Sequence, residues 1–282
     1  MLLTNYHTHC HFCDGKGSPE EMLSQARELG FKAIGFSSHA PLPFENDFTL
    51  QSERLPEYIE TITRLKNSTS DMEVYLGLEI DYMAGLMYPA QAKWGELGLD
   101  YVIGSVHALA APDEQYPMLS VDGPDEELDA LINDVFSGDV RKMIETYYQR
   151  ISDLCQEGGF DILGHYDLIK KHNLRKPFFD ESASWYKDVA ISTLDDVAKS
   201  GVIMEVNFGG MLRGATDDVY PPLWLIEEAF KRGIPMQINA DAHAPKHLGV
   251  HHEYSRDLLV KAGYKTQRVL LSGTWQDVSL TN

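Results

Sequence analysis

Two short motifs in this chain place metal-binding side chains two residues apart. His7 and His9 form an H-x-H pair near the start, and Asp241 and His243 form a D-x-H pair near the end. Residues i and i+2 of extended backbone point to the same side, so both members of a pair can reach one ion. Imidazole nitrogens and carboxylate oxygens together suit zinc, manganese or iron. The two pairs therefore indicate transition-metal chemistry.

Five further side chains of the same chemical types follow apolar runs or lie on the loop beyond the first pair. They are Asp14, His39, Glu79, His107 and His165. Taken singly, each is more typical of a helix cap or a surface turn than of a metal site. With the two pairs they make nine candidate ligands, which is more than one tetrahedral ion needs. We therefore expect two or three divalent ions, with Glu79 as the bridging carboxylate.

The elements that must position these residues are seven short apolar runs of β type. We expect strands over Leu2–Tyr6, Ala33–Phe36, Val74–Leu78, Tyr101–Gly104, Asp161–Leu163, Val202–Val206 and Met236–Ile238. Helical stretches separate them, and the first begins at Ser18 with the capping-box residue Glu21 three positions later. This α/β alternation favours a single-domain (β/α)7 TIM-like barrel over residues 1–282 that is distorted or incompletely closed. The C-terminal strand ends of such a barrel meet at one mouth, where we expect the metal site.

Two segments lie outside this regular alternation. The stretch Ala108–Pro124 contains three prolines and little periodicity, so we expect a long loop on the ligand side that acts as a substrate lid. The stretch Arg268–Trp275 is expected to be a tail that closes the chain.

Composition narrows the range of partners. The chain has 43 acidic and 24 basic residues, a net charge of −19, which repels nucleic acid and anionic membranes. No apolar run reaches the roughly 20 residues of a membrane span. Three cysteines are too few, and odd in number, for a disulfide framework. We expect a cytoplasmic protein that acts on a small molecule, with no nucleic-acid or membrane partner and no indication of protein partners.

As a set, these residues resemble the polymerase and histidinol phosphatase (PHP) superfamily, and most of all its histidinol-phosphate phosphatase branch. The resemblance runs in family order from Leu3 to about Gly273. The segments that carry it are His7–Asp14 (HTHCHFCD), Ser38–Pro43 (SHAPLP), Gly77–Tyr82 (GLEIDY), Gly104–His107 (GSVH), Gly164–Asp167 (GHYD) and Asp241–His243 (DAH).

The resemblance implies a site for three divalent transition-metal ions, which would be zinc, manganese or iron. The first ion would be held by His7, His9, Glu79 and Asp241, the second by Glu79, His107 and His165, and the third by Asp14, His39 and His243. It also implies that Glu79, Asp241 and His243 are catalytic. All nine positions carry residues able to bind a metal, so the resemblance implies that the site is catalytically competent.

The activity implied by the resemblance is hydrolysis of L-histidinol phosphate to L-histidinol and phosphate, a step of histidine biosynthesis. A hydroxide bridging two ions would be the nucleophile, because the cations lower the pKa of bound water from 15.7 towards 7. A related phosphoesterase acting on phosphotyrosine proteins or on nucleic-acid ends is an alternative. A third alternative is a non-catalytic, metal-dependent binding module, which the complete ligand set disfavours.

Three side chains are candidates for substrate binding. Arg213 follows the sixth strand, and its planar guanidinium fits the geometry of a phosphate. Arg175 lies in the loop after the fifth strand and is a second candidate for phosphate. His11, on the loop of the first pair, is expected to contact substrate or to orient a neighbour.

A further group is expected to support the site. Glu205 and Asn207, at the end of the sixth strand, are candidates for orienting the metal ligands through hydrogen bonds without binding an ion themselves. An imidazole-bearing amino alcohol needs an aromatic wall and a carboxylate for its ammonium group. Candidates on suitable loops are Phe12, Phe44, Glu45 and Asp47.

Overall fold

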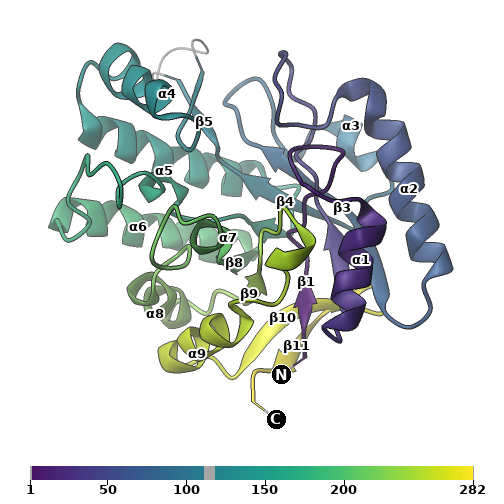
Figure 1. The fold of residues 1–282 in the computed structure, drawn as a ribbon. Coiled ribbons are helices and arrows are strands. Elements are labelled where there is room, and N and C mark those ends of the chain that lie inside the picture. Colours follow the sequence, from purple (N-terminus) through teal and green to yellow (C-terminus); the bar gives the residue numbers. More distant parts are fainter. Residues whose placement is uncertain (1, 111–117, 282) are drawn as a thin grey trace.

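The computed structural model describes residues 2–110 and 118–281. Within these ranges, seven strands form one parallel sheet in the order β1-β2-β3-β4-β7-β8-β9. They are β1 (Thr4–Asn5), β2 (Ala33–Phe36), β3 (Glu73–Asp81), β4 (Tyr101–Ser105), β7 (Ile162–Leu163), β8 (Ile203–Asn207) and β9 (Met236–Asn239). Each strand pairs with the strand before it, and the helices lie outside the sheet (Figure 1). The sequence-based prediction of a single-domain (β/α)7 barrel is confirmed.

Strands β1 and β9 are not paired along their lengths, so the barrel is nearly closed, and its two edges meet just beyond the ends of both strands. Thr8 and Ala242 form a parallel bridge. The His9 N–H donates to the Ala242 carbonyl at 2.9 Å, and the Ala242 N–H donates to the His7 carbonyl at 3.1 Å. These bonds join the H-x-H motif to the D-x-H motif. Residues from opposite ends of the sequence are therefore side by side at the mouth of the barrel.

The opposite end of the barrel is filled by aromatic side chains. The Tyr101 ring is buried, and a β-carbon at Gly35 or Gly77 would collide with it. Those two positions therefore need glycine to admit the ring. Tyr6 packs edge-on against Tyr101 with the ring centroids 5.8 Å apart.

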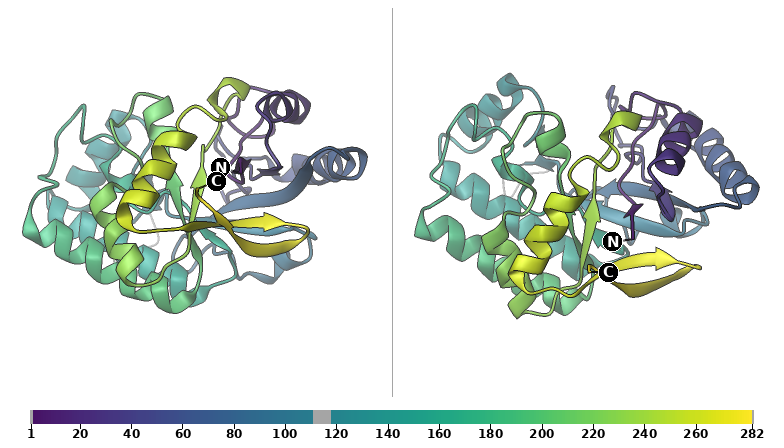
Figure 2. Two further views of the ribbon diagram at one scale, coloured as in Figure 1. Left: turned by 90° about the horizontal axis from the view of Figure 1, so that it is seen from below. Right: turned by 60° about the horizontal axis from the view of Figure 1, so that its bottom comes forward.

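The prediction of a C-terminal tail is wrong, because this segment forms part of a β-hairpin that covers the aromatic end of the barrel. Strand β10 (Thr266–Leu271) pairs antiparallel with β11 (Thr274–Ser279) through a two-residue turn at Ser272 and Gly273, both with positive φ. The Tyr6 hydroxyl donates to the Leu270 carbonyl at 2.6 Å and accepts from the Leu270 N–H at 3.1 Å. Figure 2 shows the hairpin lying across the end of the barrel close to both termini.

The helices are α1 (Pro19–Glu28), α2 (Leu55–Ser68), α3 (Ala92–Gly95), α4 (Asp125–Ala130), α5 (Val140–Glu157), α6 (Ser184–Ser200), α7 (Gly209–Leu212), α8 (Leu223–Lys231) and α9 (His252–Ala262). Helix α1 begins with the predicted capping box: Ser18 Oγ accepts from the Glu21 N–H at 3.1 Å, and Glu21 Oε2 accepts from the Ser18 N–H at 2.7 Å. None of the helices in the described ranges is long and apolar enough to cross a membrane.

The predicted loop over Ala108–Pro124 contains a small element of structure. Strands β5 (Ala108–Leu109) and β6 (Leu119–Ser120) pair antiparallel. Residues 111–117, between them, lie outside the described residues, so the predicted lid is described only at its two ends.

Candidate metal centre

All nine candidate ligands lie at the C-terminal ends of the barrel strands. A cavity of about 500 Å³ opens there. The candidate ligands that line it are Asp14, His39, Glu79, His107, His165, Asp241 and His243. His7 and His9 are fully buried, within 3.4 Å of Glu79. The parallel barrel therefore brings together residues that are more than 200 positions apart in the sequence.

One oxygen of Glu79 faces three histidines from β1 and β2. Glu79 Oε2 lies 3.2 Å from His7 Nε2, 3.4 Å from His9 Nε2 and 3.0 Å from His39 Nδ1. Glu79 is on β3, next to β2 in the sheet, and His39 forms a bridge with it just past the end of β2. The neighbouring strand ends thus bring three imidazoles to one carboxylate oxygen.

The other oxygen of Glu79 faces the ends of β4 and β7. Glu79 Oε1 lies 3.0 Å from His165 Nε2 and 3.5 Å from His107 Nε2. The Ser105 hydroxyl donates to Oε1 at 2.6 Å and fixes the carboxylate in this orientation. Glu79 therefore lies between imidazoles on both sides, as a bridging carboxylate must.

The D-x-H motif reaches the same cluster from β9. Asp241 Oδ1 lies 3.3 Å from His9 Nε2 and 3.7 Å from His7 Nε2, and Oδ2 accepts from Arg213 Nη2 at 2.9 Å. Asp241 has a φ of +48°, a left-handed conformation that costs a non-glycine residue free energy. Strained backbone of this kind persists where the surrounding contacts determine it, as they do here.

A third grouping lies nearer the solvent. Asp14 Oδ2 lies 3.1 Å from His243 Nε2, and Asp14 Oδ1 lies 3.9 Å from His39 Nε2. The Asp14 side chain is 34% exposed, whereas that of Glu79 is fully buried. Any cation held here would exchange with solvent more easily than one held at Glu79.

Candidate ligand atoms within 4.8 Å of one another fall into three overlapping groups. These are His7, His9 and Glu79; His39, Glu79 and His107; and His9, Asp14, His39 and His243. The groups differ in detail from the sets that the family resemblance implies, because His9 and His39 each belong to two. His165 and Asp241 are beside these groups, at the distances given above.

The buried atoms of the cluster fit metal ions. His7 Nε2, His9 Nε2, His39 Nδ1 and Glu79 Oε2 are buried without a hydrogen-bond partner among the described residues. A buried polar atom without a partner costs free energy, and a coordinated cation would remove that cost. The histidine and carboxylate donors are also those that zinc, manganese and iron accept.

The electrostatics of the cluster favour cations. Burial, together with electrostatic repulsion from the neighbouring His243 and His39 side chains, lowers the pKa of His9 to about 3, which keeps its ring neutral as a metal ligand must be. At His107, burial by itself would lower the pKa, but neighbouring carboxylates, chiefly Asp81, raise it to about 10. Carboxylates at this density need compensating positive charge, which protons or metal ions can supply.

Two buried carboxylates contact candidate ligand histidines at Nδ1, the ring nitrogen that does not face Glu79. Glu205 contacts His7 Nδ1 at 3.0 Å, as its place at the end of β8 predicted. Asp81 contacts His107 Nδ1 at 2.6 Å, and sequence reasoning missed it. The signal was present, because Asp81 follows Glu79 by two residues on one strand and must share its face.

Only one of the three predicted substrate-binding residues lines the cavity. Arg213 lines the cavity and donates to Asp241. Arg175 points elsewhere: its side chain is 64% exposed and pairs with Asp125 at the start of α4. His11 is exposed, stacks on Phe12, and does not line the cavity. Of the three, the structure brings only Arg213 to the ligands.

A second positively charged side chain, which was not predicted from the sequence, lines the cavity. Lys171 lines it, and its ammonium donates to the carboxylate and the carbonyl of Asp122 at 2.8 Å each. Lys170 and Lys171 are consecutive in the sequence, and only the structure shows which of them lines the cavity. Lys170 is buried and pairs with Asp167 at 2.8 Å instead.

The outer wall of the cavity combines apolar and acidic groups. Phe44 and Asp47 line it, as predicted from their loop. Glu45 and Phe12 are not among its lining residues. Phe48 packs edge-on against His39 with the ring centroids 5.8 Å apart, so the aromatic wall begins at the ligand cluster.

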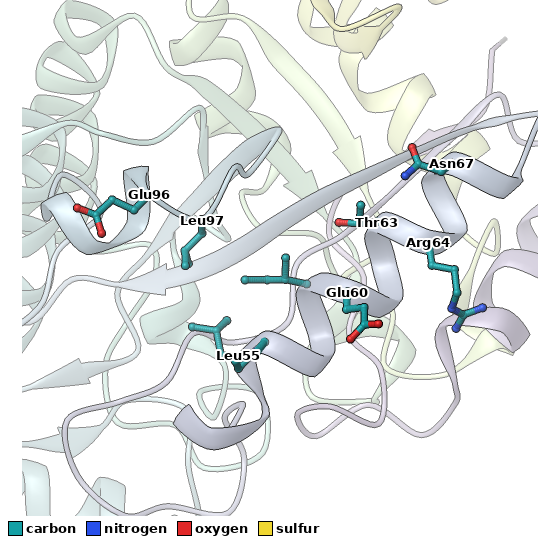
Figure 3. A pocket seen from close by; sticks show the side chains of 9 residues that line it. Leu55, Glu60, Thr63, Arg64, Asn67, Glu96 and Leu97 are labelled. Carbon is teal, nitrogen blue, oxygen red and sulfur yellow. The ribbon is translucent and has the colours of Figure 1, made fainter.

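A separate hollow of about 690 Å³ lies between α2 and the turn after α3 (Figure 3). Its lining includes Leu55, Ile59 and Leu97, and contains neither histidine nor cysteine. Arg64 at its edge pairs with Glu20 at 2.9 Å. None of the nine candidate ligands lines this hollow.

A parallel α/β barrel that gathers histidines and carboxylates at its strand ends defines a class of protein: a TIM-like barrel equipped to hold metal ions. The comparison with known families agrees with this class. Residues 5–208 match the family model described as PHP domain. The chain belongs to the PHP domain family.

Similar proteins align over most of the chain. A Deinococcus radiodurans protein named "Probable histidinol-phosphatase" is 30% identical over 253 residues, which is 88% of each chain. The histidinol-phosphatase of Bacillus subtilis is 27% identical and covers 88% of this chain and 96% of its own length. A structure of histidinol phosphate phosphatase from Lactococcus lactis, complexed with zinc, L-histidinol and phosphate, aligns with a TM-score of 0.74. It is 20% identical, and the alignment covers 97% of this chain and 98% of that one.

Proposed function

We propose that this protein is a metal-dependent phosphomonoesterase that hydrolyses L-histidinol phosphate to L-histidinol and phosphate. The observation that carries the proposal is the position of Glu79, which lies within 3.5 Å of five imidazoles at the base of the cavity. The substrate is supported by the names of the relatives from Deinococcus radiodurans and Bacillus subtilis.

We further propose that the nine candidate ligands hold three divalent ions. The ligands are His7, His9, Asp14, His39, Glu79, His107, His165, Asp241 and His243. Zinc, manganese and iron all suit this donor set. Bound divalent ions lower the pKa of water towards 7 and neutralise charge on phosphoryl oxygens. Glu79, Asp241 and His243 are the proposed catalytic residues because, as ligands, they would hold the ions that supply this chemistry.

The phosphoryl group of the substrate would meet two side-chain cations. Arg213 is oriented by Asp241, which accepts from Nη2 at 2.9 Å through its carboxylate and from Nη1 at 3.1 Å through its carbonyl. Lys171, which also lines the cavity, supplies the second positive charge from the segment after β7, whereas Arg213 follows β8. A guanidinium can donate two parallel bonds to a phosphate, while an ammonium acts as a point charge.

The leaving alcohol would occupy the outer part of the cavity. Phe44 and Phe48 offer aromatic faces to an imidazole ring, and Asp47 offers a carboxylate to the ammonium group. This combination fits a small cationic amino alcohol better than a polyanion. The cavity chemistry therefore favours histidinol phosphate over nucleic-acid ends.

Phosphate release from L-histidinol phosphate by zinc- or manganese-loaded protein tests the proposal, with p-nitrophenyl phosphate and a phosphotyrosine peptide as comparison substrates. We expect kcat/KM for histidinol phosphate to be at least about a hundredfold higher, because specific contacts to the leaving group discriminate to this extent. Activity should disappear on chelation. Equal, weak turnover of all three substrates would contradict the proposed substrate and retain the phosphatase chemistry.

We propose the cytoplasm as the location of the protein. The three cysteines, Cys10, Cys13 and Cys155, are free in the structure, as expected for a reducing compartment.

A further inference from the structure

Glu205 is a fully buried carboxylate whose oxygens are already in use. Oε1 accepts from the His165 backbone N–H at 2.8 Å and from the Asn207 side-chain amide at 2.8 Å. Oε2 accepts from the Asn239 side-chain amide at 2.9 Å. His7 Nδ1 lies 3.1 Å from Oε1 and 3.0 Å from Oε2. A carboxylate has about four lone-pair sites, so these partners leave none for an ion.

We propose that Glu205 is a positioning residue for the metal centre: it fixes His7 so that Nε2, and not Nδ1, is presented to an ion. The proposal rests on the proposed function, in which His7 is a ligand. An imidazole that donates its Nδ1 proton to a carboxylate must carry its free lone pair on Nε2. His7 Nε2 lies 3.2 Å from Glu79 Oε2 and 3.7 Å from Asp241 Oδ1, where the candidate ligand atoms converge.

Glu205 also acts on the other side of the cluster. Its bond to the His165 N–H holds the backbone of a second candidate ligand, whose Nε2 lies 3.0 Å from Glu79 Oε1. One carboxylate on β8 thereby fixes ligands that follow β1 and β7, on the two sides of Glu79. Asp81 contacts His107 Nδ1 in a similar way, but Glu205 alone of these two reaches both sides of Glu79.

The substitution Glu205→Gln separates this role from simple packing. Glutamine keeps the shape but replaces one acceptor oxygen with an NH2 donor, which would face groups that are themselves donors. Where that NH2 group faces His7 Nδ1, the conflict is relieved when His7 accepts at Nδ1, which places its proton on Nε2 and removes the ring as a ligand. Loss of such an outer partner costs about 10- to 100-fold in metal affinity.

The experiment is a zinc titration of the full chain against a competing chelator, with metal content measured on the same samples. Circular dichroism and thermal unfolding of the metal-free protein show whether each variant folds. We expect Glu205→Gln to fold and to bind at least one zinc ion about 10- to 100-fold more weakly than the wild type. Glu205→Asp, which keeps both acceptor oxygens on a shorter side chain, should bind zinc with intermediate affinity.

Folded Glu205→Gln protein with wild-type zinc affinity would overturn the positioning role, even if its thermal stability were lower. If Glu205→Gln does not fold, wild-type affinity in Glu205→Asp would overturn it. Wild-type protein that binds no zinc, manganese or iron would refute the metal centre itself, so the two failures are distinguishable.

Discussion

Glycine at position 209 is required by the contact between α7 and the D-x-H motif. A β-carbon there would lie 2.6 Å from Asp241 Oδ2 and 2.9 Å from Arg213 Nη2. The backbone of Gly209 is outside the left-handed region, so alanine would not strain it. The substitution Gly209→Ala therefore tests the space between two functional side chains without a conformational penalty.

The size of the effect follows from those distances. Restoring an ordinary contact requires Asp241 Oδ2 to move by about 0.8 Å, which separates it from the Arg213 guanidinium. A charge-assisted hydrogen bond of this kind contributes about 1.5–3 kcal/mol, equivalent to roughly 10- to 150-fold in a binding or rate constant. We expect kcat/KM for L-histidinol phosphate to fall by that factor, together with the affinity for metal.

The assay is kcat/KM under metal saturation, with zinc affinity measured in parallel. Gly95→Ala is the matched control, because Gly95 lies in α3 and its β-carbon would meet nothing within 4 Å. The control should keep wild-type kinetics and gain up to about 1 kcal/mol of stability. Gly209→Ala with kcat/KM and zinc affinity within twofold of the wild type would refute the steric argument.

Three further predictions address the ligands, the phosphate contact and the fold. Glu79→Gln should lose at least one ion per chain and more than about 100-fold in kcat/KM, beyond the cost of losing an outer partner; metal analysis showing full occupancy with wild-type turnover would contradict its bridging role. Arg213→Lys keeps a cation beside Asp241 but loses the bidentate geometry, so KM for the phosphate ester should rise about tenfold; an unchanged KM would assign Arg213 to structure alone. Burial lowers the pKa of His252 to about 4, so the unfolded chain binds this proton first as the pH falls and the folded state loses about 2 kcal/mol between pH 7.5 and 5. His252→Gln should remove that share of the acid sensitivity in urea unfolding curves, and an identical difference between the two pH values in both proteins would show that His252 does not contribute.

The barrel was predictable because its signals are local. A strand of alternating or continuous apolar residues followed by a histidine or acid is visible within a few positions, and chain order then places the strands. The capping box at Ser18 and Glu21 is local in the same sense. The hairpin β10–β11 was missed, although the turn residues Ser272 and Gly273 carried a usable signal.

Arg175 shows where this kind of prediction ends. It follows His165 in the sequence, as a phosphate-binding arginine of that loop would, yet its guanidinium pairs with Asp125, which is 50 residues earlier. Lys171 is only four residues away and lines the cavity. The direction of a long side chain on a loop depends on its partners in space, and those partners are set by packing between helices.

The sequence by itself determined which atoms can bind metal and at which strand end each one lies, because side-chain alternation and the parallel barrel follow from local patterns. Only the tertiary structure decided how those atoms are shared. The placement of Glu79 between five imidazoles, the contact of Glu205 with His7 and the contact of Arg213 with Asp241 join strands and loops far apart in the chain. Their distances depend on the closure and twist of the whole barrel, and no local pattern encodes those.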